Sequence, residues 1–316
     1  MKNFTSVKDV SDLNELLELA QHVKENPFGD KHLGENKTLG LLFFNPSLRT
    51  RMSTQRAATN LGMNVMVMNL NNDGWQLEME DGTIMDQGTQ EHIKEAAGVI
   101  SQYCDIIGVR TFPSLSDQAE DYSEKIISKF IQHASVPVIS LESATRHPLQ
   151  SFADAITINE HKPQAKPKVV LTWAPHPRAL PQAVPNSFVE WMKELDVELV
   201  ITHPKGAELS NEFTQGVSIV YDQQEALKDA DFVYVKNWSS FSNYGQRIEN
   251  CEDWKISMEK LKHTNNAKIM HCLPVRRNVV IDDEVLDSTQ SIVLQQASNR
   301  TVAAQAVLLN ILKHEN

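Results

Sequence analysis

The residues best suited to chemistry stand together in one short stretch, Ser47-Leu48-Arg49-Thr50-Arg51. An apolar run ending at Phe44 precedes it and a helix-forming segment ending at Gly62 follows it, so its hydroxyls and guanidiniums occupy the first turn of a helix. The backbone N–H groups of such a turn favour an anion, and this stretch adds charged donors to them. The sequence therefore predicts a phosphate-binding turn, although a capped helix with solvated arginines fits the stretch alone equally well.

Polar and charged side chains also follow several other apolar runs of the chain. They are Arg110, Glu142 to His147, Pro175 to Arg178, Lys236 to Trp238, and His271 to Arg277. In parallel α/β sheets, ligands bind at the carboxyl ends of the strands, where these residues would lie. Because the net charge is −11, cations gathered at these positions indicate an anionic small molecule rather than a nucleic acid.

Strand-like and helical patterns alternate along the chain, which is typical of doubly wound parallel sheets. Strands are predicted at 38–44, 64–70, 105–109, 137–141, 168–173, 197–202, 217–221, 231–236 and 267–273. Helices are predicted at 7–24, 47–61, 91–103, 122–133, 186–195, 223–229 and 299–313, with another opening at 147–150.

The length of 316 residues favours two domains over one. We expect two doubly wound α/β domains, 1–146 and 147–298, joined by a hinge near 142–155. The C-terminal helix, 299–316, is expected to return to the first domain.

Composition excludes several classes of protein. No apolar run approaches the length of about 20 residues that a membrane helix needs, and no signal-peptide core is present, so we expect a cytoplasmic protein without membrane contacts. The three cysteines, Cys104, Cys251 and Cys272, lack the spacing of a zinc site or a disulfide framework. No glycine-rich dinucleotide or P-loop motif occurs, and we expect neither a metal nor a cofactor.

Four motifs of the chain together resemble the aspartate/ornithine carbamoyltransferase family. They are the stretch at 47–51, His147-Pro148-Leu149-Gln150, His271-Cys272-Leu273-Pro274 and Asn299-Arg300, in the order and rough spacing of that family. The resemblance spans nearly the whole chain. It implies a carbamoyl phosphate domain followed by an amino-acid domain, assembled as a homotrimer with active sites between subunits.

The resemblance also implies a carbamoyl phosphate site. Its expected members are Ser47, Leu48, Arg49, Thr50, Trp75, Arg110, His147, Gln150, Cys272, Leu273 and Arg300. Arg49, Arg110 and His147 would be catalytic: Arg49 on the phosphate, Arg110 between phosphate and carbonyl oxygen, and His147 on that oxygen. Gln150 and the main-chain carbonyls of Cys272 and Leu273 would accept from the carbamoyl NH₂. No side-chain general base is assigned, because the leaving phosphate would help to take the proton of the amine.

Several of these residues also fit a purely structural reading. His147 at a helix start fits a cap, and Cys272 on a strand fits a small buried hydrophobe. Trp75 is either offered to a neighbouring subunit or packed on its own loop. Arg276 and Arg277 are read as a solvated pair outside the core site.

The second substrate is indicated by departures from the ornithine enzymes. Where those carry an Asp-x-x-x-Ser-Met-Gly motif for a free ammonium, this chain has Lys236 and Asn237, which resembles the N-acylornithine branch. The residues expected to bind an acylornithine are Gln90, Glu142, His176, Arg178 and Lys236. Since an extra buried carboxylate needs its own charged partner, three cations favour N-succinyl-L-ornithine over N-acetyl-L-ornithine as the acceptor in arginine biosynthesis.

The residue Gln90 does not decide which acyl group the substrate carries. In this branch, proline at that position is associated with succinylornithine and glutamate with acetylornithine, and Gln90 matches neither. Three readings from other classes also remain: an NAD-dependent dehydrogenase, a non-catalytic amino-acid binding protein of the exported type, and a paralogue that serves as an interaction protein. The first lacks its glycine-rich motif and the second its export signal, and retention of every phosphate-binding motif counts against the third.

Overall fold

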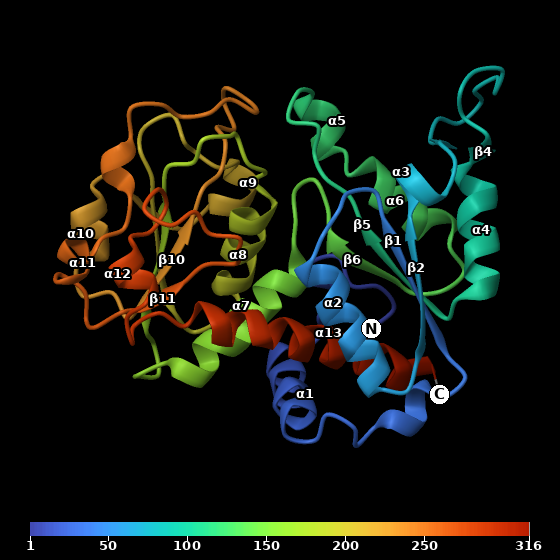
Figure 1. Cartoon of the computed structure of the whole chain (residues 1–316), viewed down its shortest axis with the longest axis horizontal. Coiled ribbons are helices and arrows are strands. Elements are labelled where there is room, and N and C mark those ends of the chain that lie inside the picture. The colour runs from blue at the N-terminus through green and yellow to red at the C-terminus, as the bar shows by residue number, and fades with distance from the viewer. Residues whose placement is uncertain (316) are drawn as a thin grey trace. The chain divides into compact units, whose positions relative to one another are not determined.

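The computed structural model describes residues 1–315, and their contacts divide the chain into two compact units (Figure 1). Unit 1 contains Met1–Ser114, Ala119–Leu149 and the chain from Arg300 onward. Unit 2 contains Leu115–Gln118 and Gln150–Asn299. Asn316, the last residue of the predicted C-terminal helix, lies outside the described residues.

Unit 1 is built on a parallel sheet with the strand order β2-β1-β5-β6. Its strands are β1 (Thr38–Phe43), β2 (Asn64–Asn69), β5 (Ile106–Arg110) and β6 (Val138–Glu142). All of β1 after its first residue is buried, as expected of an apolar strand that is covered on both faces. The structure adds a short parallel pair, β3 (Leu77–Glu78) and β4 (Glu91–His92).

Helices and 3-10 turns connect these strands. They are η1 (Val7–Asp9), α1 (Leu13–Glu25), η2 (Lys31–Gly34), α2 (Arg49–Asn60), α3 (Leu70–Asp73), α4 (Ile93–Tyr103), α5 (Gln118–Tyr122) and α6 (Lys125–His133). The helix predicted at 7–24 is confirmed from Leu13 onward by α1, whereas its first residues form the separate 3-10 turn η1. Ser6 and Asp9 form a capping box at the start of η1, which ends at the extended Val10, and the Asp12 carboxylate then accepts from the backbone N–H of Asn14 at 2.8 Å and starts α1.

The core of unit 1 joins its sheet to α4 and α6. Buried side chains of the strands and of these two helices form one cluster, which includes Leu42, Ile93, Ala97, Ile107, Val109, Ile127 and Phe130. The last helix, α13 (Val293–Glu315), starts in unit 2 and continues in unit 1, where Asn60 of α2 donates to Gln305 at 2.8 Å. The predicted return of the C-terminal helix to the first domain is therefore confirmed.

Unit 2 has a parallel sheet with the strand order β11-β10-β7-β8-β9. Its strands are β7 (Lys168–Trp173), β8 (Glu198–Thr202), β9 (Ser218–Val220), β10 (Phe232–Lys236) and β11 (Lys268–Met270). Its other elements are α7 (Pro148–His161, from Gln150), α8 (Ala183–Lys193), α9 (Asn211–Thr214), α10 (Gln223–Leu227), η3 (Glu252–Trp254), α11 (Met258–Leu261) and α12 (Asp283–Leu286). Within residues 1–315, no helix is both long and apolar enough to cross a membrane.

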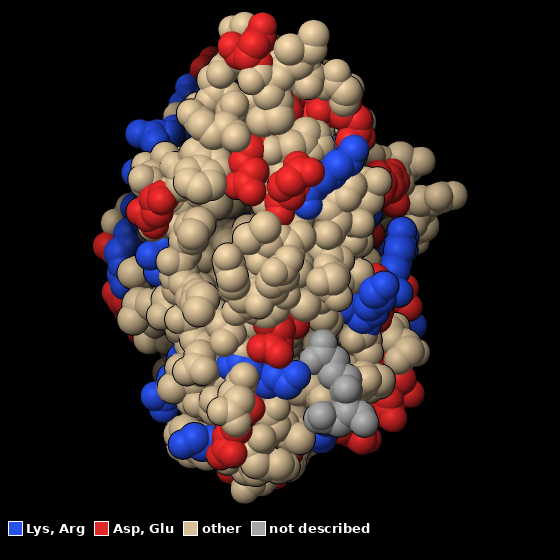
Figure 2. All heavy atoms as spheres, turned by 90° about the vertical axis from the view of Figure 1, so that its right-hand side faces the viewer, with Lys and Arg blue, Asp and Glu red and all other residues tan. Residues whose placement is uncertain are grey.

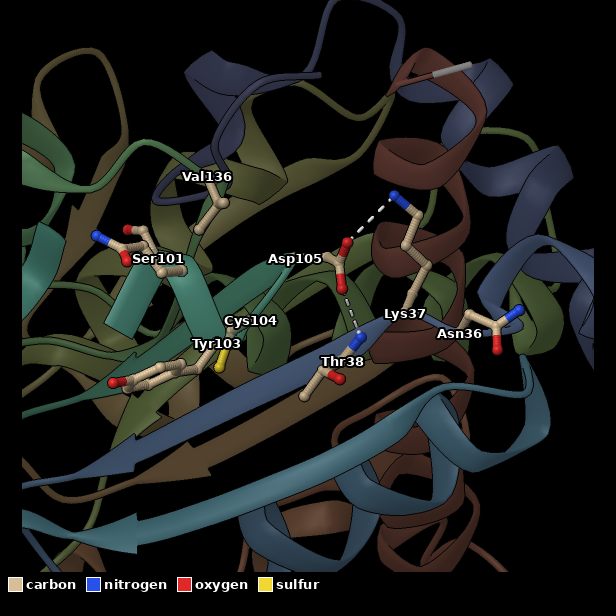
Figure 3. A pocket seen from close by; sticks show the side chains of 9 residues that line it. Asn36, Lys37, Thr38, Ser101, Tyr103, Cys104, Asp105 and Val136 are labelled. Atoms are coloured by element: carbon tan, nitrogen blue, oxygen red, sulfur yellow. Dashed lines mark hydrogen bonds and ion pairs between the residues drawn. The ribbon is translucent and has the colours of Figure 1, made fainter. Parts of the chain in front are cut away.

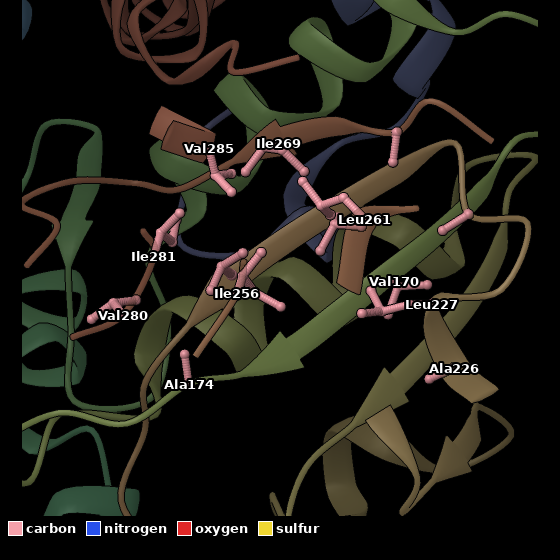
Figure 4. Packing of buried hydrophobic residues seen from close by; sticks show 14 of the residues in the cluster. Val170, Ala174, Ala226, Leu227, Ile256, Leu261, Ile269, Val280, Ile281 and Val285 are labelled. Carbon is pink, nitrogen blue, oxygen red and sulfur yellow. The ribbon is translucent and has the colours of Figure 1, made fainter. Parts of the chain in front are cut away.

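Two apolar layers enclose the sheet of unit 2. One contains α10, α11 and α12, whose buried side chains pack with those of β7, β10 and β11 around Val170, Leu227, Leu261 and Ile269 (Figure 4). In the other, Phe188 of α8 lies 4.3 Å from the Tyr234 ring, between ring centroids. The predicted fold class, two α/β domains with parallel sheets, is confirmed.

Each sheet changes its winding direction at one point. In unit 1 this point lies between β1 and β5, and in unit 2 between β7 and β10. Such switch points open a crevice at the carboxyl ends of the two strands, where ligands of doubly wound folds bind. The fold thus brings the segments after β1 and β5 together in unit 1, and those after β7 and β10 in unit 2.

Candidate functional site

The start of α2 follows β1 at the switch point of unit 1. The helix begins at Arg49, two residues after its predicted start, and the Ser47 hydroxyl accepts from the Thr50 backbone N–H at 3.3 Å. Leu48 precedes the helix and its side chain is exposed. The first-turn N–H groups and the Arg49 side chain belong to this one turn, which therefore has the composition of an anion site.

Arg110 ends β5 beside Glu142, which ends β6. The register shifts between Val109 and Arg110, so that Arg110 pairs directly with Glu142 and its Nη2 donates to the carboxylate at 2.6 Å. Its Nη1 donates to the backbone oxygen of Pro46 at 2.8 Å, just before the α2 turn. The guanidinium lies 4.5 Å from the centre of the Phe112 ring. These contacts hold a buried cation next to the predicted phosphate-binding turn.

His147 and Arg300 complete a cluster around this turn. The Nε2 atom of His147 lies 3.5 Å from Glu142 Oε2 and 3.3 Å from Arg300 Nη1, and Arg300 Nη2 donates to the Thr50 hydroxyl at 3.2 Å. Thr50, Arg110, Glu142, His147 and Arg300 are all buried. Five of the residues predicted from scattered motifs are thus brought together in unit 1.

Glu124 positions the loop that connects Glu142 to His147, although no sequence pattern indicated this residue. Its carboxylate accepts from the Ser143 hydroxyl at 2.6 Å and from the Thr145 backbone N–H at 2.8 Å. Glu124 has a left-handed backbone (φ 51°), immediately before α6. A lone glutamate with a left-handed backbone has no motif, so only the folded chain reveals this contact.

The unit 1 cluster can bind a dianion and polarise a carbonyl. Guanidiniums give charge-assisted hydrogen bonds to phosphate oxygens, and an imidazole adds a donor where negative charge develops on oxygen. The Nε atom of Arg110 is buried without a hydrogen-bond partner among residues 1–315, so one donor of this side chain remains for a ligand.

Trp75 and Gln90 lie in the loop that contains β3 and β4. The Trp75 side chain is 57% exposed, and its indole N–H donates to Glu91 at 2.8 Å. Gln90 is exposed, and its backbone N–H donates to the oxygen of Gln76 at 3.0 Å. Both hydrogen bonds stay within this loop. The structure does not bring them into the cluster around Arg110.

In unit 2, the segments after β7 and β10 are tied to each other. The Trp173 indole donates to the backbone oxygen of Trp238 at 2.9 Å, and the Asn237 amide donates to that of Ala174 at 2.7 Å. Lys236 is buried at the end of β10, where its Nζ donates to the Asn237 oxygen at 3.1 Å. These bonds fix the backbone on both sides of the switch point.

His176 lies near several cations at the switch point of unit 2. Its Nε2 accepts from Arg276 Nε at 3.1 Å, which fits a neutral ring, and its Nδ1 lies 2.9 Å from the backbone oxygen of Arg178 and 3.1 Å from the backbone nitrogen of the same residue. Burial, and then the charges of Lys236, Arg276 and Arg178, lower the pKa of His176 below its ordinary value. The predicted residues His176, Arg178 and Lys236 thus influence one another, and Arg276, which sequence reasoning left outside, joins them.

The turn after β11 carries the last predicted residues. The Leu273 backbone N–H donates to His271 Nδ1 at 2.8 Å, Leu273 has a left-handed backbone (φ 56°), and the Leu273–Pro274 bond is cis. Cys272 is half-buried between them.

On α7, the buried Gln150 amide donates to Asp154 at 2.8 Å. Within residues 1–315, no cluster of three or more His, Cys, Asp or Glu side chains could hold a metal ion.

Unit 1 also has an open pocket of about 620 Å³ at the amino ends of β1 and β5 (Figure 3). There the Asp105 carboxylate accepts from the Thr38 N–H at 2.7 Å and lies 3.2 Å from Lys37 Nζ. The length of β1, about 20 Å, separates this pocket from the α2 turn, so it is not part of the candidate site.

Comparison with known proteins gives matches over most of the chain. The carbamoyl-phosphate-binding domain of aspartate/ornithine carbamoyltransferases matches residues 2–160, and the Asp/Orn-binding domain of that family matches residues 181–311. An N-succinylornithine carbamoyltransferase of Bacteroides fragilis is 53% identical over 316 residues, which cover 99% of both chains. An N-acetylornithine carbamoyltransferase of Xanthomonas campestris is 34% identical, with 98% of this chain and 97% of the relative covered.

Solved structures agree with these matches. A mutant form of N-acetyl-L-ornithine transcarbamylase, complexed with carbamyl phosphate and N-succinyl-L-norvaline, has a TM-score of 0.93 to this chain. The two are 33% identical, and the match covers 98% of this chain and 100% of the other. The resemblance carried by the four motifs is confirmed: the chain belongs to the aspartate/ornithine carbamoyltransferase family.

Proposed function

We propose that this protein transfers the carbamoyl group of carbamoyl phosphate to the δ-amine of N-succinyl-L-ornithine, giving N-succinyl-L-citrulline and phosphate. This is a step of arginine biosynthesis. The observation that carries the proposal is the 53% identity, over the full chain, to a protein named N-succinylornithine carbamoyltransferase. The relative named for acetylornithine is 34% identical.

Carbamoyl phosphate is held in unit 1 by the α2 turn and the buried cluster. The backbone of Ser47 and Leu48, the Thr50 hydroxyl and the Arg49 guanidinium bind the phosphate. Arg300, which already donates to Thr50, adds a further cation. The closeness of cation, hydroxyl and helix start supports this assignment.

Arg110 and His147 act on the carbonyl oxygen. As the δ-nitrogen attacks the carbonyl carbon, the C=O electrons move onto oxygen, and both side chains stabilise that charge. Each donor of this kind contributes about 3 kcal/mol to the rate. The C–O bond to the phosphate then breaks, and the departing phosphate takes a proton from the amine. Gln150 and the backbone oxygens of Cys272 and Leu273 accept from the carbamoyl NH₂.

The acylated amino acid is recognised by the cations at the switch point of unit 2. Arg178, Lys236 and Arg276 offer charges for two carboxylates, while the neutral His176 orients Arg276. Glu142 accepts from the N–H of the acylated nitrogen, and Gln90 stands by the acyl group. The surplus of positive charge supports the succinyl over the acetyl substrate, because a second carboxylate needs its own partner.

The proposal includes a homotrimer in which Trp75 is offered to a neighbouring subunit, and the cytoplasmic location expected from the sequence. Apolar side chains remain exposed on the edge strand β2 and on α2, namely Met52, Met66 and Met68. The face of the molecule in Figure 2 has charges of both signs around a broad uncharged middle. The exposed methionines of β2 and α2 are apolar surface of the kind that supports self-association.

The test is product formation from carbamoyl phosphate with ornithine, N-acetylornithine and N-succinylornithine side by side. We expect the highest kcat/KM with succinylornithine and the lowest with ornithine, because only the former has a carboxylate for each part of the cationic cluster. A preference for acetylornithine would replace the acceptor in the proposal, and absence of transfer to all three would refute it.

Two arginine variants test the unit 1 assignment. Arg110→Gln removes a donor to the carbonyl oxygen, so we expect kcat to fall by about 100-fold or more. Arg277→Gln is the control, because Arg277 is exposed and pairs with Asp283 and Asp287 instead. It should leave kcat within about twofold of the native value, since exposed ion pairs contribute little. Near-normal turnover by Arg110→Gln would reject its role.

A further inference from the structure

Asp154 is a fully buried carboxylate on α7 that the reaction proposed above does not use. Its Oδ1 accepts from two side-chain amides, that of Gln150 at 2.8 Å and that of Gln296 at 2.7 Å. Burial of a charged carboxylate costs free energy, which indicates that the hydrogen bonds of Asp154 have a function beyond packing.

Simple docking of α7 to α13 does not require this charge. Close by in the chain, Asn299 of α13 donates to the Thr157 hydroxyl and to the Glu160 carboxylate of α7, both at 3.0 Å, so the same two helices are linked within unit 2 without the charge of Asp154. What a carboxylate offers that a neutral group does not is an acceptor without any N–H or O–H of its own. Asp154 thus dictates which end of each amide faces it.

The first consequence concerns Gln150. A carboxylate oxygen only accepts, so the NH₂ end of the Gln150 amide must face Asp154, and its carbonyl Oε1 is directed away. The reverse orientation would place two acceptors 2.8 Å apart. Asp154 therefore makes Gln150 present an acceptor, which is the group that a carbamoyl NH₂ needs.

The second consequence reaches the turn after β11. Because Gln296 turns its NH₂ to Asp154, its Oε1 is left to accept from the His271 backbone N–H at 2.8 Å. His271 Nδ1 in turn accepts from the Leu273 backbone N–H at 2.8 Å, in a turn where Leu273 has φ 56°. A left-handed leucine is strained and persists only where its surroundings hold it. One carboxylate thus anchors both groups that are proposed to accept from the substrate NH₂.

We propose that Asp154 is a positioning residue that orients Gln150 and the 271–273 turn as acceptors, and so makes the protein select an NH₂ over a methyl group. This role rests on the proposed function, since it concerns the carbamoyl end of carbamoyl phosphate. The matching probe is acetyl phosphate, which has a methyl group in place of the NH₂. A site built to accept hydrogen bonds rejects such an analogue because its acceptors are left unpaired.

The test measures binding of carbamoyl phosphate, acetyl phosphate and inorganic phosphate by calorimetry, without the amine. The native protein should prefer carbamoyl over acetyl phosphate, and Asp154→Val, of similar size but without an acceptor, should reduce that preference at least about tenfold. Affinity for inorganic phosphate, bound by residues of unit 1, should stay within about threefold. A general loss of structure would lower all three affinities together.

Asp231→Val is the matched control. Asp231 is also a buried carboxylate in unit 2, and it accepts from two side-chain amides, those of Gln164 at 2.8 Å and Asn265 at 2.7 Å. It differs from Asp154 in its place, because it lies immediately before β10, at the amino end of that strand. Its substitution should lower stability and leave the preference for carbamoyl phosphate unchanged. If Asp154→Val does not fold, Asp154→Asn decides: its neutral oxygen is a weaker acceptor, so the preference should fall at least about threefold.

The outcomes separate the two proposals. A native protein that does not prefer carbamoyl over acetyl phosphate overturns the role of Asp154, whereas the proposed function is overturned only by the absence of carbamoyl transfer. A native preference that survives in Asp154→Val, or in Asp154→Asn where the valine variant does not fold, overturns the role of Asp154 alone.

Discussion

Arg276 and Arg277 are adjacent in the chain but meet opposite surroundings. Arg277 is exposed and lies 2.9 Å from Asp283 and 2.7 Å from Asp287, so two carboxylates compensate its charge. Arg276 donates to the neutral ring of His176, which leaves its charge uncompensated by that partner. One arginine of the pair therefore stabilises the α12 region, and the other belongs with the cations at the switch point.

His176 makes stability depend on pH. Its folded pKa lies below the ordinary histidine value of about 6.5, first because of burial and then because of neighbouring cations. Between these two values the unfolded chain binds more protons than the folded chain, so stability falls as pH falls through this window and is constant below it. We expect the urea midpoint to decrease as the pH is lowered through and below the ordinary histidine pKa, and His176→Gln to reduce this decrease.

Tryptophan fluorescence is a suitable measurement, because Trp173, Trp191 and Trp238 are fully buried in unit 2. His32→Gln is the control, since His32 is exposed in unit 1. It should show the native pH dependence. An equal decrease in the native protein and in His176→Gln would contradict the lowered pKa.

At the level of elements, α2 is fixed at both ends. Its first turn is held by the Ser47 hydroxyl and its end by Gly62, which has φ 84° and donates to the Thr59 oxygen at 3.1 Å. The predicted stop at Gly62 is confirmed. Because the phosphate-binding turn and this stop belong to one helix of twelve residues, the position of the turn depends on how the helix ends.

A pair of glycine-to-alanine substitutions tests this helix end. The added methyl group in Gly62→Ala would lie 2.4 Å from the Lys31 backbone oxygen in a left-handed conformation, so we expect a loss of about 2–4 kcal/mol in unfolding free energy. Gly98 lies inside α4 with no atom within 4 Å of the new methyl group. Gly98→Ala should therefore stabilise by about 0.5–1 kcal/mol. Unfolding followed by circular dichroism checks both, and equal effects would contradict the assigned cap.

For the whole molecule, shared active sites have a measurable consequence. If Trp75 serves a neighbouring subunit, Trp75→Ala and Arg110→Gln subunits are each defective, but random mixing rebuilds about a quarter of the sites. We expect the native mass to be three times 35.7 kDa and activity to reappear after mixing. Activity that only averages the two parents would place Trp75 with its own subunit, where its indole already donates to Glu91.

The sequence by itself determined the fold class, the predicted strands and the family. Periodicity of apolar residues is a local property, and it is strong where strands are buried on both faces, as β1, β5, β7 and β10 are. The motifs around Ser47, His147, His271 and Arg300 could be read for the same reason, because each is contiguous in the chain. The start of α1 was less well predicted than the strands. Periodicity alone suggested one longer helix, whereas α1 begins after its cap residue, Asp12.

Only the tertiary structure decided which side chains meet. Glu124, Asp154, Gln296 and Arg276 belong to no motif, and each has a partner 20, 142, 25 and 100 residues away in the chain, respectively. The bulge that turns Arg110 to Glu142 depends on the pairing of β5 with β6. Such contacts arise from strand order and register, which fix positions between distant segments, and no local pattern of residue types contains that information.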